Sequence, residues 1–135
     1  MSDLISASSL LLAILTTLFG TYYSSINEIL NLEPNNFKDD DKANYAMAKI
    51  ILKTKLIPLL LSSIFLTAIF IPKAIELVIT SYNNVSTVKF EKIKYDTIST
   101  SYIAVTIFMI SLTINIIIIA SKFYRKMKSI NPNRN

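Results

Sequence analysis

The chain has 135 residues, of which 52% are hydrophobic, and it carries a formal net charge of +5 at pH 7. It contains no Cys and no His, which excludes disulfide frameworks, thiol nucleophiles, Ser-His-Asp triads and Cys/His zinc sites. A single Gly leaves no room for a Gly-rich phosphate-binding loop. Soluble domains are also about half apolar, so the arrangement of the apolar residues is more informative than their number.

Three long apolar blocks predict an all-α integral membrane protein with transmembrane helices at about 4–26, 56–80 and 98–122. A bilayer core of about 30 Å requires about 20 helical residues at 1.5 Å per residue, and each block is that long. The first block could instead be a signal peptide, but no Lys or Arg precedes it and no charge interrupts it between Asp3 and Glu28. We therefore expect three spans packed as a bundle.

The second block contains the residues that distinguish it from a plain apolar helix. Pro58 falls in its first turn, where a missing N–H does little harm, whereas Pro72 is expected to kink the helix or end its straight part. Lys73 and Glu76 follow at a spacing of three residues, which allows an intramembrane ion pair. The pair either anchors the helix at the outer interface or forms part of an ion or proton path.

The segments between the blocks have patterns of their own. An amphipathic cytoplasmic helix is expected at about 40–55, with Asp39–Asp41 at its positive N-terminal end. A metal site is the alternative for these carboxylates, but the Gly and distant Glu of a calcium loop are missing. The apolar face of this helix would hold Ala43, Ala46, Met47 and Ile50, and its lysine stripe Lys42, Lys49 and Lys53. Residues 88–95 partly alternate, which hints at a short strand.

The positive residues are divided unevenly between the two sides of the predicted bundle. Five Lys lie in the first loop and five Lys or Arg from residue 122 onward, against three or four between the second and third spans. The positive-inside rule places the N-terminus outside and residues 122–135 in the cytoplasm as a short basic tail. We expect one membrane domain, 1–135, in a bacterial or archaeal cytoplasmic membrane. Anionic lipid head groups are expected to contact Lys49, Lys53, Lys122, Arg125 and Lys126.

Small and polar side chains share one face of the first and third helices. On the first helix they are Ser9, Ala13, Thr16 and Gly20, and on the third they are Ser111 and Asn115. Small residues let helix backbones approach closely, and packing drives helix association in lipid. We expect these faces to point inward. The Asn115 amide would bond a neighbouring helix or line a polar path.

These features favour a structural or accessory membrane subunit that acts through helix packing, by self-association or with another membrane protein. The alternative is a pore former, since three spans, an outside N-terminus and a short basic tail resemble the topology of three-span phage holins, although the first loop is longer here. Polar side chains on one face would then line the path in an oligomer. The absence of a nucleophile–base pair argues against an enzyme. No cofactor, metal or nucleic acid is expected as a ligand.

Overall fold

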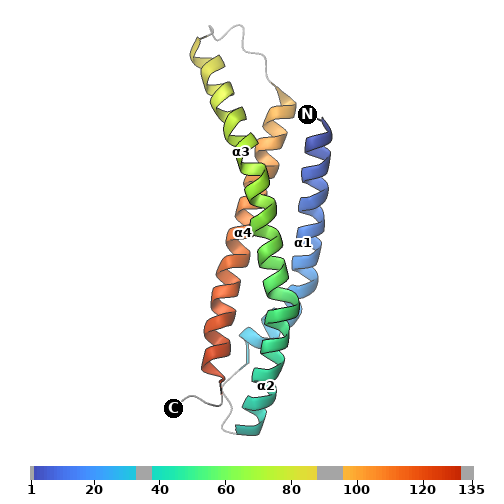
Figure 1. The fold of residues 1–135 in the computed structure, drawn as a ribbon, viewed down its shortest axis with the longest axis vertical. Helices are drawn as coiled ribbons and strands as arrows, with labels where there is room; N and C mark the ends of the chain where they lie inside the picture. Colours follow the sequence, from blue (N-terminus) through green and yellow to red (C-terminus); the bar gives the residue numbers. More distant parts are fainter. Residues whose placement is uncertain (1, 33–37, 88–95, 132–135) are drawn as a thin grey trace.

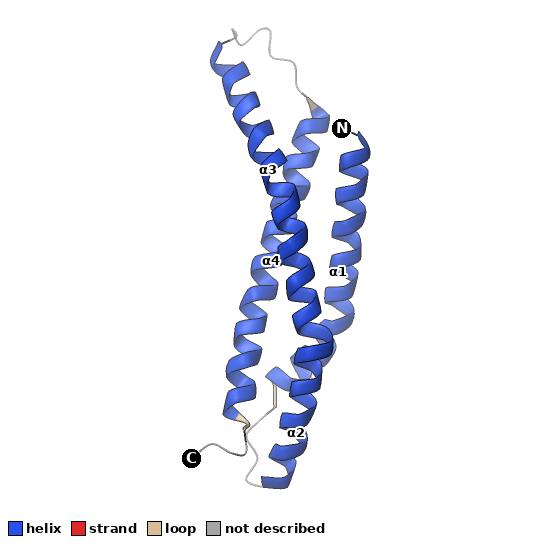
Figure 2. Cartoon of the chain, viewed as in Figure 1, coloured by secondary structure: helices blue, strands red, loops and turns tan. Residues whose placement is uncertain are grey.

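The computed structural model describes residues 2–32, 38–87 and 96–131, and over these ranges the chain is helical apart from short ends, without a strand (Figure 2). The elements are α1 (Ser2–Leu30), α2 (Lys38–Ile51), the π-helical turn η1 (Leu52–Leu56), α3 (Ile57–Thr87) and α4 (Thr97–Ser129). Three helical segments are long and apolar enough to cross a membrane. The strand suggested for residues 88–95 lies outside the described residues.

Three of the helices run side by side along the long axis of the molecule, and α2 continues the line of α3 at the end where the C-terminus lies (Figure 1). The segments α2, η1 and α3 contain 14, 5 and 31 residues, so together they are about 75 Å long at 1.5 Å per residue. This length is more than twice the roughly 30 Å of a bilayer core.

The helices extend past the ends predicted from the apolar blocks. Helix α1 ends at Leu30 rather than near residue 26, α3 at Thr87 rather than near 80, and α4 at Ser129 rather than near 122. The first half of the predicted basic tail is therefore helical. Once a helix has formed over its apolar part, each added residue gains a hydrogen bond without a new nucleation cost, so polar residues continue it until a terminator.

The turn η1 explains how α2 and α3 form one continuous helix despite a proline. Pro58 has no N–H, and its ring would clash with the carbonyl four residues earlier, that of Thr54. The chain responds with a wider turn, in which the Ile57 N–H donates to the Leu52 carbonyl five residues before it. The predicted lead-in helix at about 40–55 therefore corresponds to α2 and most of η1.

Pro72 does not end α3, which continues for a further fifteen residues to Thr87. The proline leaves the Ala68 carbonyl without its usual intrahelical donor. Figure 1 shows the end of α3 that follows (yellow) leaning away from α4. This divergence agrees with the bend expected at an internal proline.

The start of α4 is fixed by Asp96, whose carboxylate accepts hydrogen bonds from the backbone N–H groups of Ile98 and Ser99. These are two of the N–H groups that a helix N-terminus leaves without intrahelical partners. The Ser99 hydroxyl also donates to this carboxylate, and together with the backbone donors it lowers the pKa of Asp96 below its ordinary value of 3.8. The same helix closes with the Ile130 N–H on the Lys126 carbonyl.

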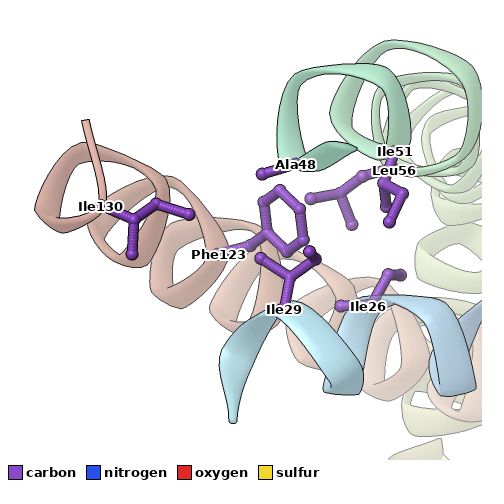
Figure 3. Close-up of a cluster of buried hydrophobic side chains, with 7 residues drawn as sticks. All are labelled: Ile26, Ile29, Ala48, Ile51, Leu56, Phe123 and Ile130. Carbon is purple, nitrogen blue, oxygen red and sulfur yellow. The ribbon is translucent and has the colours of Figure 1, made fainter. Parts of the chain in front are cut away.

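Three apolar clusters hold the helices together, and the largest lies at the α2 end of the molecule. There, Phe123 of α4 packs between Ile26 and Ile29 of α1 and residues of α2 and η1, among them Ala48 and Ile51 (Figure 3). A middle cluster joins Leu15, Leu59 and Ile116, one from each long helix, and a third joins α3 and α4 around Phe70, Ala74, Leu77, Tyr102 and Met109. Because the clusters follow one another along the axis, every long helix is packed over most of its length.

Candidate functional site

Within the described residues, the fully buried hydrogen bonds that join two helices lie between α3 and α4. The hydroxyl oxygens of Thr67 and Thr113 lie 2.8 Å apart, and the Thr113 hydroxyl donates to the backbone carbonyl of Ser63 at 3.3 Å. Thr113 has one proton to give, so Thr67 must be the donor in the first bond. In the apolar cluster around Phe70, the Tyr102 hydroxyl donates to the Phe70 carbonyl at 3.2 Å. Among the described side chains no buried polar atom lacks a partner. The hydrogen bonds of Thr67, Thr113 and Tyr102 therefore join α3 to α4 and leave no buried polar atom free for a ligand.

The contacts of Thr67, Thr113 and Tyr102 between helices were not predicted from the sequence, although a spacing signal was present. The buried residues of α4 are Tyr102, Thr106, Met109, Thr113, Ile116 and Phe123, which follow alternating steps of four and three apart from one omitted position. This is the heptad spacing of helices that pack along a continuous seam. The hydroxyls at 106 and 113 lie on that seam between apolar residues.

The small and polar face predicted to point inward lies on the outside of the single chain. Ser9, Ala13, Thr16 and Gly20 are exposed on α1, and Ser111 and Asn115 are exposed on α4. A Cβ added at Gly20 would meet no atom within 4 Å, so no neighbouring helix uses its small size. The inward expectation was wrong for one chain because Leu15, Ile26 and Ile29 provide a better-filled seam on the other side of α1.

Part of this outward face forms a groove between α1 and α4, which we term the central groove. It has a volume of about 270 Å³ and is lined by Leu12, Thr16, Phe108, Ser111, Leu112 and Asn115. The Thr16 hydroxyl donates to the Leu12 carbonyl of its own helix at 2.8 Å. The Asn115 amide has no hydrogen-bond partner within the described part of the chain. The structure thus brings three of the predicted residues, Thr16, Ser111 and Asn115, into one site.

A second and larger groove lies between the same helices near their C-terminal ends, and we term it the basic groove. Its volume is about 580 Å³. Helix α4 contributes Ile119, Lys122, Arg125, Lys126 and Ser129. The opposite wall is formed by Tyr23, Asn27 and Leu30 of α1 and by Asn31 in the turn that follows it. Three of the cations predicted to meet anionic head groups therefore face one cavity. Lys49 and Lys53 are exposed on α2 and η1 and do not line it.

Two other lysines have partners inside the chain. Lys73 Nζ lies 2.8 Å from Glu76 Oε1, with side chains 38% and 63% exposed. Lys55, on η1, donates to the Ser25 hydroxyl at 2.7 Å and lies 5.8 Å from the ring centre of Tyr22. The pair at 73 and 76 matches the expected spacing and lies on the surface of α3, whereas Lys55 ties η1 to α1.

Helix α2 packs on the bundle through Ala48 and Ile51, which are buried against α1 and α4. The predicted apolar face of Ala43, Ala46, Met47 and Ile50 is exposed in the single chain. Helix α2 begins at Lys38, so Asp39–Asp41 fall in its first turn, and among the described residues no group of carboxylates suits a metal ion.

The comparisons with known proteins give no further guide. No family model matches this chain, and no curated protein and no solved structure is significantly similar to it. What can be stated of its class is that the described chain is helical and contains three segments long and apolar enough to cross a membrane. Any functional conclusion must come from the two grooves and the charge distribution.

Proposed function

We propose that the chain is a non-catalytic, three-span membrane protein that acts through lateral helix packing, and that copies of it associate through the central groove. The observation that carries the proposal is the Asn115 amide, which is exposed near the middle of α4 and has no partner among the described residues. In a span, the middle of α4 lies deep in hydrocarbon, where water is not available to an amide.

Self-association is favoured by the chemistry of this face. An Asn side chain both donates and accepts, so two amides related by a two-fold axis can pair with each other. The neighbouring small residues allow the close backbone approach that such a pair needs, and Gly20 has open space above it. The groove is lined by hydroxyl, amide and apolar groups without an acid–base pair, which supports a packing role rather than a reaction.

The proposed orientation follows from the charges that the fold gathers at one end. The α2 end of the bundle holds the basic residues of α2, η1 and the last turns of α4, namely Lys42, Lys49, Lys53, Lys55, Lys122, Arg125, Lys126 and Lys128. Among the described residues, Lys73 is the cation toward the other end. The positive-inside rule then places the C-terminus and α2 in the cytoplasm and the N-terminus outside. The exposed Lys49 and Lys53 would meet anionic head groups or, farther from the bilayer, a cytosolic partner.

The proposal is tested by measuring oligomer formation in liposomes, with energy transfer between labelled copies at increasing protein-to-lipid ratio. Asn115→Leu removes the amide, and loss of one interhelical hydrogen bond at about 0.6–2 kcal/mol should weaken association about threefold to thirtyfold. Gly20→Leu should weaken it further by blocking close approach. Ala68→Leu also introduces a Leu side chain, on the exposed side of α3, and should have no effect. If Asn115→Leu, Gly20→Leu and Ala68→Leu all associated as strongly as the native chain, the proposal would be contradicted.

A pore is the second candidate, because Thr16, Ser111 and Asn115 would line a polar path if several copies turned their central grooves toward a common axis. Release of a trapped dye from liposomes separates the two functions. A packing subunit leaves the dye inside at every protein density. A pore releases it, and Asn115→Leu should then reduce the rate of release.

A further inference from the structure

We propose that the basic groove binds one anionic phospholipid, with its phosphate held by Lys122, Arg125 and Lys126 and its acyl chains leaving along Ile119 toward the bilayer. This inference rests on the membrane location given above but not on self-association, since the central groove and the basic groove are lined by different residues.

The geometry of the groove follows from two helical stripes that face each other. Residues 122, 125 and 126 are three and four positions apart, so they share one face of α4 within about 6 Å along its axis. Tyr23 and Asn27 of α1 and Asn31 in the turn that follows it recur every fourth residue and supply the opposite wall. Arg125 offers a planar fork of donors and the lysines offer point charges, a combination suited to phosphate oxygens. The two Asn amides add neutral donors across the groove.

The charge of the groove is not balanced within the described chain. None of the three cations forms an ion pair there, and Glu28, the nearest acidic residue along α1, is exposed and does not line the cavity. The C-terminal ends of α1 and α4 each contribute roughly half a negative charge. Together these partial charges offset about one of three positive charges, so the groove remains a net attractor for an anion.

The polarity of the groove changes along the bundle axis in the way that a lipid requires. Its charged part lies near the C-terminal ends of α1 and α4, whereas Ile119 and, beyond it, the exposed Ile118 and Ile114 lead toward the middle of α4. Lys122 follows Ile119 after Ala120 and Ser121, at the depth expected for head groups. The amphipathic ring of Tyr23 suits the same level. A free phosphate ion would use the cations but not the apolar end, so the groove favours a phospholipid.

The test uses the full chain in neutral detergent and measures binding of phosphatidylglycerol by native mass spectrometry, with phosphatidylcholine and inorganic phosphate as comparison ligands. One phosphatidylglycerol should bind per chain in preference to phosphatidylcholine. The variant Lys122→Gln/Arg125→Gln/Lys126→Gln should lose affinity on the order of a hundredfold, at about tenfold or less per cation. The matched control Lys49→Gln/Lys53→Gln/Lys128→Gln removes the same charge from exposed positions outside the groove, two of which would meet head groups only at a bilayer surface. In detergent this control should bind the one phosphatidylglycerol as the native chain does.

Three results would overturn the proposal. Equal loss of binding in both triple variants would mean a general attraction to positive charge, and equal binding of the two lipids would mean no phosphate site. Displacement of phosphatidylglycerol by inorganic phosphate at the same low concentration would identify a free anion as the ligand. Circular dichroism of each variant checks that the helices persist. Asn115→Leu should bind phosphatidylglycerol as the native chain does, so failure of the lipid site and failure of self-association are distinguishable.

Discussion

Replacing Thr113 by Val tests whether the hydroxyl relay between α3 and α4 stabilises the bundle. Val keeps the shape of the buried side chain and removes both the bond to Thr67 and the bond to the Ser63 carbonyl. Hydrogen bonds between helices in membranes average about 0.6 kcal/mol. Thr113→Val should therefore cost about 1.2 kcal/mol of unfolding free energy. Thr67→Val removes one bond and should cost about 0.6 kcal/mol.

The double variant distinguishes a relay from two independent effects. Once Thr113 is Val, the Thr67 hydroxyl has no interhelical partner, so Thr67→Val should add almost nothing, which gives a coupling energy of about 0.6 kcal/mol. The assay is SDS-induced unfolding in neutral micelles, followed by energy transfer between dyes at Ser62→Cys and Ser121→Cys, two exposed positions in a chain without native Cys. Thr17→Val is the control, because Thr17 is exposed and bonds its own helix at the Ala13 carbonyl. Strictly additive costs for the double variant would refute the relay.

Three further predictions concern the packing and the helix ends. Phe123→Ala removes a fully buried ring from the cluster at the α2 end and should lower the unfolding free energy by about 3 kcal/mol in the same assay. A change below about 0.5 kcal/mol, as expected for exposed residues, would show that this cluster is not formed. Asp96→Ala should speed amide exchange at Ser99, because the carboxylate that accepts this N–H is removed. In the native chain the bond lowers the pKa of Asp96, so the protection should be intact above pH 3.8 and lost as the pH falls below it and the carboxylate is protonated. Protection that does not depend on pH would contradict the cap. Pro58→Ala should convert the wide turn to a regular one and rotate α2 relative to α3 by about 100°. Distances between spin labels on α2 and α4 should change accordingly. Unchanged distances would mean that the proline does not cause the turn.

The sequence was sufficient to place the helices because length and hydropathy report what a membrane helix needs. The cores of α1, α3 and α4 lie where the apolar blocks predicted them. The ends were predicted too early, since Asn83 and Asn84 are typical of loops and yet continue α3. A helix end depends on which residue finally offers the backbone a better partner, and polarity alone does not report this.

The facing of the helices could not be predicted by the same reasoning. In a soluble helix the buried side is the apolar side, but here Ile116 on the seam and Ile117 on the outside have the same polarity. The rule that polar residues point inward then selected Ser111 and Asn115, whereas the chain buries Thr113. Heptad spacing distinguishes the two faces, because seam positions must recur at alternating steps of three and four along the whole helix.

The two candidate sites differ in how far the sequence reached. The members of the central groove were named from their shared face, but its position on the outside required the fold. The cations of the basic groove were predicted to form part of a tail. Only the helical continuation of α4 to Ser129 aligns them opposite Asn27 of α1 and Asn31 in the turn after α1. No sequence pattern relates these two segments, which lie about ninety residues apart.

The central claim, that three helices cross the bilayer, is tested most directly by labelling single Cys residues in intact vesicles with a membrane-impermeant maleimide. The account predicts that Tyr82→Cys is labelled from outside and Ser129→Cys only after permeabilisation. Ile107→Cys and Ile114→Cys, which are exposed in the single chain, should remain unlabelled in both conditions because lipid covers them. Labelling of either Ile position in intact vesicles would show that water reaches this surface, and the three-span arrangement would be wrong.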